Sequence, residues 1–153
     1  LISNNKLIDL KNNSEIKRSW ELVIPEGETV EQCLSLGGML SNWNKKKKGS
    51  PKGILSLFEH ATSGDNIANG ILEKAANAFM YLIKDRTDFF YSQNTKPEKI
   101  VIGQRLGKLL SDKNNPLSKL LLKNYNNHIP IEISTDRRTA AIGAAYKAHE
   151  NIK

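Results

Sequence analysis

Apolar residues in the middle of the chain recur every three or four positions, which is the spacing of one face of an α-helix. Asp65 stands directly before this run, where an aspartate side chain can cap a helix N-terminus. The pattern therefore predicts a long helix that begins after Asp65 and buries one face. The positions expected on that face are Ile67, Ile71, Ala75, Ala78, Phe79, Leu82 and Ile83.

Two short apolar runs in the second half of the chain predict strands. Residues 100–102 are three consecutive β-branched residues, which is typical of a strand buried on both faces. Residues 129–133 predict a second strand. The Asn115-Pro116 pair begins a helix between the two strands, and Thr135 or Asp136 begins a last helix after them. Strands that alternate with helices in this way predict neighbouring parallel strands.

The first residues of the chain read as antiparallel strands. Residues 1–10 predict a hairpin, because two short apolar runs flank Asn4-Asn5, and asparagine tolerates the backbone of a tight turn. Residues 16–24 predict a third strand that Pro25 ends. The predicted fold class is therefore α/β, with three antiparallel N-terminal strands followed by alternating helices and two parallel strands.

The segment between these halves predicts short helices and a loop. Residues 27–40 predict a short helix that ends at Gly37-Gly38, and residues 42–50 predict a loop. The Ser-Pro pair at the start of residues 50–60 predicts a helix that runs to the end of that range. Ser63-Gly64 then breaks the chain before the long helix.

Composition favours one ordinary folded domain over residues 1–153. Hydrophobic residues make up 39% of the chain and charged residues 25%, values that exclude a disordered polymer. Cys33 alone cannot form an internal disulfide, which favours the cytoplasm. No apolar run is long enough for a membrane span, and no signal peptide pattern precedes the first strand.

A net charge of +7 raises the question of nucleic acid, but most of the excess is not clustered. The one run of basic residues consists of Lys45 to Lys48 and Lys52. It is interpreted either as a solvated loop or as an anion-binding segment. No recognition-helix arrangement accompanies the run, so nucleic acid is not the expected partner. The three histidines have no ligand spacing, and no nucleophile-base grouping indicates a hydrolase.

Three segments carry a resemblance to a known family. They are HATSGDNIANGILEKAANAFMYLI at 60–83, KPEKIVIG at 96–103 and IEISTDRRTAAIGAAYKA at 131–148. In order and spacing they resemble the C-terminal half of the ROK family of sugar kinases and repressors, within the actin-like ATPase superfamily. The resemblance covers residues 53–148 and, more faintly, residues 1–24. It implies a ribonuclease-H-like fold, and it implies that the chain is the C-terminal lobe of a longer two-lobe protein.

The resemblance also implies a nucleotide site. In such kinases ATP and Mg²⁺ lie between the two lobes, and the C-terminal lobe holds the adenine near the glycine after the fourth strand. Gly103, Gln104 and Arg105 occupy that position here, and Gly143 recurs at the family spacing. The family usually continues with further glycines. The side chains of Gln104 and Arg105 therefore stand where the backbone of the family is expected to approach the nucleotide closely. Gly103 also reads as a plain strand-to-helix turn, and Gly143 as a helix-packing glycine.

For the sugar, the family uses a glutamate followed after one residue by Gly-His. Glu21 is the closest match, with Val23 and Ile24 in place of the Gly-His pair, and the alternative interpretation is an exposed strand residue. Family members commonly bind a structural zinc ion through a histidine and several cysteines. Only Cys33 remains here, so no zinc site is expected.

These observations lead to two expectations about function. The first is the C-terminal lobe of an ATP-dependent carbohydrate kinase that acts on a hexose or N-acetylhexosamine. Its catalytic aspartate belongs to the missing N-terminal lobe or to a partner chain, so no catalytic residue is assigned here. The second is a non-catalytic sugar-sensing or regulatory module of ROK type. A homodimer is compatible with either.

Overall fold

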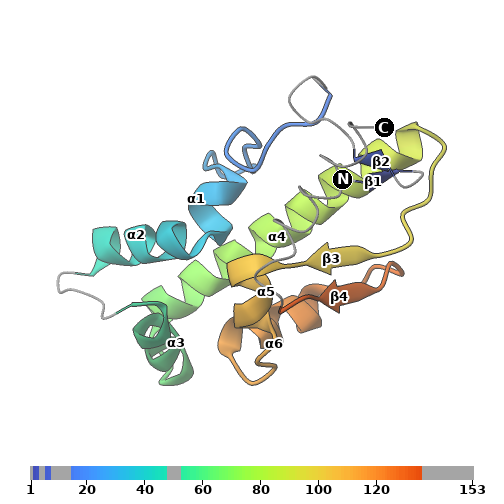
Figure 1. The fold of residues 1–153 in the computed structure, drawn as a ribbon. Coiled ribbons are helices and arrows are strands. Elements are labelled where there is room, and N and C mark those ends of the chain that lie inside the picture. The colour runs from blue at the N-terminus through green and yellow to red at the C-terminus, as the bar shows by residue number, and fades with distance from the viewer. Residues whose placement is uncertain (1, 4–5, 8–14, 48–52, 136–153) are drawn as a thin grey trace, which may run out of the picture.

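The computed structural model describes residues 2–3, 6–7, 15–47 and 53–135 of the 153-residue chain. Within these residues the fold is mixed α/β, mostly helical, with a small parallel sheet of two strands (Figure 1). The elements are β1 (Ile2–Ser3), β2 (Lys6–Leu7), α1 (Val30–Leu34), α2 (Leu36–Lys46), α3 (Ile54–Thr62), α4 (Asn66–Ser92), β3 (Ile100–Ile102), α5 (Gln104–Leu110), α6 (Pro116–Asn124) and β4 (Ile131–Ile133).

Helix α4 is the centre of the fold, as its apolar pattern predicts. The Asp65 carboxylate accepts hydrogen bonds from the N–H groups of Ile67 and Ala68, at 2.9 and 3.1 Å, and so caps the first turn. Helices α1, α2, α3 and α6 all pack against α4, which runs diagonally through the molecule in Figure 1. Most of the predicted face is buried; Leu82 is half-buried, and Ile67 is 37% exposed.

Small side chains line the buried face of α4. Ala68, Ala75, Ala76 and Ala78 are completely buried and belong to the same apolar core as the neighbouring helices. An alanine projects only one carbon from the helix, so neighbouring helices can approach the α4 backbone closely. This face explains how a single helix can support packing partners on several sides.

A tight corner joins α1 to α2. Ser35 ends α1, and its hydroxyl also accepts a hydrogen bond from Gly38 N–H at 3.0 Å, so it caps α2 as well. A Cβ on Gly38 would lie 2.3 Å from the Gln32 carbonyl oxygen, so only glycine fits there. The prediction of one helix ending at Gly37-Gly38 was wrong, because these glycines form the first turn of α2.

The predicted loop at residues 42–50 was also wrong where the structure describes it, because α2 continues to Lys46. Trp43 explains the difference: only 2% of its surface is exposed, and its burial in the core stabilises the helix. At the end of α2 the Lys47 ammonium lies 4.7 Å from the Trp43 ring centroid and pairs with Asp65. Lys47 therefore fixes this corner, whereas Lys45 and Lys46 are exposed.

The N-terminal region matches the sequence prediction only in part. Strands β1 and β2 pair antiparallel as the expected hairpin, and the turn between them lies outside the described residues. The third strand, predicted at residues 16–24, was wrong: this segment forms turns, with one isolated bridge from Val23 to Thr29. Leu22 and Ile24 are buried on either side of exposed Val23, so an irregular segment on the core reproduces the alternation of a strand.

Strands β3 and β4 form the predicted parallel pair, with Ile100 opposite Ile131 and Ile102 opposite Ile133. Helices α5 and α6 connect them. The prediction that residues 100–102 are buried on both faces was wrong, because Val101 is 53% exposed while Ile102 is buried. Of the elements described here, only β4 pairs with β3, so the other edge of β3 has no strand partner among them.

The remaining helix starts follow their caps. Asn115 caps α6 and Pro116 is its first residue, as predicted. Helix α3 starts at Ile54 after Gly53, later than the Ser-Pro pair suggests, and residues 50–51 lie outside the described residues. The predicted last helix and Gly143 also lie outside them. None of the described helices is long and apolar enough to cross a membrane.

Candidate functional site

The corner between β3 and α5 holds three of the residues that the sequence singles out. Gly103 has an ordinary extended backbone with φ of −117°, and a Cβ added there would meet only the Ser134 Cβ at 4.0 Å. Gln104 takes the left-handed conformation instead, with φ of 56°. The strained position of the turn is therefore occupied by glutamine, one residue after the glycine that sequence reasoning selected.

Gly107 is the glycine that this corner requires. A Cβ there would lie 2.5 Å from the carbonyl oxygens of both Ile102 and Ser134. Its absence lets α5 sit directly on the carboxyl ends of β3 and β4. Sequence reasoning missed this residue, although its spacing of four from Gly103 puts the two glycines on the same side of the helix.

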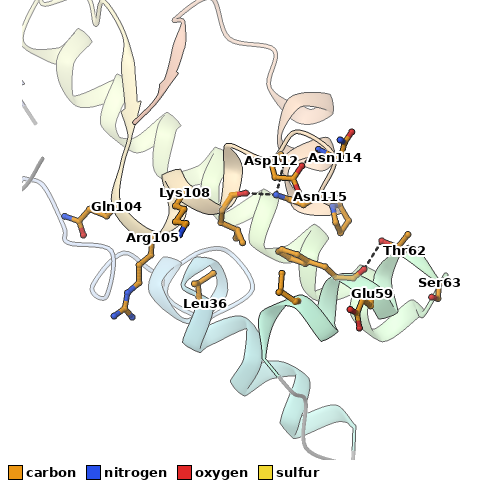
Figure 2. A pocket seen from close by; sticks show the side chains of 14 residues that line it. Leu36, Glu59, Thr62, Ser63, Gln104, Arg105, Lys108, Asp112, Asn114 and Asn115 are labelled. Carbon is orange, nitrogen blue, oxygen red and sulfur yellow. Dashed lines mark hydrogen bonds between the residues drawn. The ribbon is translucent and has the colours of Figure 1, made fainter. Parts of the chain in front are cut away.

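An open groove of about 1290 Å³ lies between α3, α5 and the segment that leads into α6 (Figure 2). We call it the α3–α5 groove. Its apolar lining consists of Leu36, Leu55, Phe58, Leu109 and Pro116. Its polar and charged lining consists of Glu59, Thr62, Ser63, Gln104, Arg105, Lys108, Asp112, Asn114 and Asn115. Figure 2 shows Gln104 and Arg105 at one end, Glu59 and Ser63 at the other, and Lys108 between them.

A second groove of about 810 Å³ lies on the other side of the same corner, and we call it the α1–β3 groove. Val101, Gly103 and Leu106 line it from β3 and α5, and it shares Leu36, Gln104 and Arg105 with the α3–α5 groove. Gln104 and Arg105 therefore stand where the two grooves meet.

Asn115 makes one wall of the α3–α5 groove rigid. Its side-chain amide donates to the carbonyl oxygens of Leu109 and Asp112, at 2.7 and 2.9 Å. Its side-chain oxygen accepts from Ser118 N–H at 2.7 Å, which caps α6. All these bonds join the end of α5 to the start of α6, so this wall is preformed and does not need a ligand to order it.

The Ser63-Gly64-Asp65 turn contributes to the opposite wall. Gly64 takes a positive φ of 85°, which turns the chain from α3 into α4 and leaves Ser63 on the groove. Asp65 does not line the groove and forms an ion pair with Lys47. The hydrogen bond from the Lys47 ammonium, followed by that from Ala68 N–H, holds the pKa of Asp65 below its usual value. Asp65 is thus a capping residue, as predicted.

The other predicted site residues do not join the grooves. Glu21 lies in an exposed turn, where its carboxylate accepts a hydrogen bond from Arg18 N–H at 2.9 Å. It lines neither groove, although nearby Ser19 and Glu31 line the α1–β3 groove and are hydrogen-bonded to each other at 2.8 Å. Cys33 is buried, and its burial raises the pKa of the thiol. Gly143 lies outside the described residues.

Sequence reasoning missed the groove residues that come from α3 and from the body of α5, including Phe58, Glu59 and Lys108. No local motif marks them, because they become neighbours only when α3 and α5 pack on the same core. The described residues contain no group of three or more histidine, cysteine, aspartate or glutamate side chains that could hold a metal ion.

No protein-family model, no curated protein and no solved structure matches this chain.

Proposed function

We propose that this chain is the C-terminal lobe of an ATP-dependent carbohydrate kinase with a ribonuclease-H-like fold, as its resemblance to the ROK family implies. The observation that carries the proposal is the α3–α5 groove. One segment that resembles the family, residues 60–83, borders it through Ser63, and Gln104 and Arg105, which follow the resembling segment 96–103, border it as well. The adenine of ATP is expected beside the turn that follows β3, and this groove lies there.

The chemistry of the groove suits a nucleoside. Adenine has flat apolar faces and polar edges, and the groove offers Phe58 and Leu109 next to Ser63, Glu59 and Asn114. Leu55 on its wall is 67% exposed, so a ligand or a second lobe could cover it. Ligand pockets usually measure about 300–1,000 Å³. The larger volume here, about 1290 Å³, supports a cleft that needs a second lobe to close it.

The proposed reaction needs parts that this chain does not supply. Mg²⁺ bound to ATP would neutralise charge on the transferred phosphoryl group, and an aspartate of the N-terminal lobe would take the proton of the sugar hydroxyl. The role of this lobe is to bind and orient the nucleotide. Glu21 remains the proposed sugar ligand, on an exposed turn next to residues of the α1–β3 groove.

Leu55 gives a direct test of nucleotide binding by the full chain. Leu55→Asp puts a carboxylate on the groove wall at a largely exposed position, so the fold should persist while ATP affinity falls about tenfold or more. Leu122→Asp is the matched control, because Leu122 is 63% exposed on α6 and lines neither groove. Isothermal titration with ATP should separate the two variants. Equal affinities, or no ATP binding by the folded wild type, would contradict the proposal.

Catalysis is tested by adding the missing lobe. The chain mixed with an N-terminal lobe that supplies the aspartate should phosphorylate a hexose or an N-acetylhexosamine, measured as ADP release that depends on both partners. ADP release without sugar would be simple hydrolysis, so the sugar phosphate is measured as well. A folded, ATP-binding mixture that turns over none of these sugars would argue against a kinase.

The alternative function is a non-catalytic sugar-sensing or regulatory module. Gln104 favours it, because a strained glutamine and the following Arg105 stand where the family carries glycines. Such a module would bind sugar or a partner protein, including a second copy of the chain, without measurable ATP affinity. Titration with sugars in the absence of nucleotide distinguishes this module from the kinase lobe.

A further inference from the structure

We draw no further inference here: the strongest candidate, the α1–β3 groove beside the edge of β3 that has no strand partner among the described residues, carries nothing because nothing in the structure shows what covers it.

Discussion

Gln104 adopts a conformation that glycine would hold at lower cost. Its φ of 56° belongs to the left-handed region, which costs a residue with a Cβ about 1–2 kcal/mol. Gly103, directly before it, has the backbone of any ordinary residue. The strain therefore falls on a residue that lines both grooves, where a glutamine amide could contact a ligand.

This strain can be measured by substitution. Gln104→Gly should raise the free energy of unfolding by about 0.5–1 kcal/mol, because the relieved strain exceeds the extra chain entropy of glycine. Gln104→Val should lower it by about 1 kcal/mol or more, because a β-branched residue fits the left-handed region poorly. Urea denaturation measures both. Equal stability of the two variants would contradict the assigned backbone conformation.

Asp65 should make stability depend on pH. Its folded pKa lies below the unfolded value of about 4, so the interaction stabilises the fold above that value. The stabilisation is lost as the pH falls through the lower folded pKa. Asp65→Asn keeps a capping oxygen but removes the charge that pairs with Lys47, and should therefore be less stable than the wild type near neutral pH.

The comparison is made by chemical denaturation across the acid range. The difference between the wild type and Asp65→Asn should shrink as the carboxylate protonates. A difference that stays constant into strong acid would mean that the charge of Asp65 contributes nothing to stability.

At the scale of elements, one glycine determines how α5 sits on the sheet. Gly107→Ala should lower the free energy of unfolding by about 2–3 kcal/mol, because the new methyl group meets two backbone carbonyls that cannot move independently. Gly103→Ala is the control and should change stability by about 0.5 kcal/mol or less, since a Cβ there has room. A small effect at Gly107 would mean that α5 lies farther from β3 and β4.

Local sequence signals predicted the elements whose ends and faces they encode. The Asp65 cap and apolar spacing located α4, Asn115-Pro116 located the start of α6, and the β-branched runs located β3 and β4. Helix α2 was missed because its first turn contains two glycines, residues that usually end helices, and because burial of Trp43 depends on distant packing.

The residues of the candidate site also fall into those that local sequence signals identify and those that only tertiary packing brings together. Gln104 and Arg105 could be found because they directly follow a strand that the sequence reveals. Lys108 and Glu59 could not, because their side chains become neighbours only through the packing of α5 and α3. The turn that carries Glu21 could not be foreseen either, since the alternation of Leu22 and Ile24 imitates a strand, although its exposure agrees with the interpretation as an exposed residue.

At the scale of the whole molecule, the fold depends on α4 more than on the sheet. This helix packs against α1, α2, α3 and α6, whereas the sheet has two strands of three residues in the described chain. The two groove walls, on α3 and on the start of α6, therefore both pack against the same helix, α4. A ligand that bridges these walls would meet a preformed surface.

Because α4 is central to the core, a buried leucine on α4 should contribute more to the free energy of unfolding than an exposed leucine elsewhere. Leu72→Ala should lower the free energy of unfolding by about 2–5 kcal/mol, because Leu72 is completely buried in the core and leaves a cavity. Leu122→Ala, at a position that is 63% exposed, should change it by about 0.5 kcal/mol or less. Thermal and urea denaturation should agree, and similar effects of the two substitutions would contradict this packing.

Ser35 serves two helices at once, because it is the C-terminal cap of α1 and the N-terminal cap of α2. With an extra residue inserted there, one residue could no longer cap both helices, so either the end of α1 or the start of α2 would lose its cap. Helix α2 would also rotate by about 100° relative to the core. Engineers who wish to graft a tag or a reporter should therefore avoid this corner.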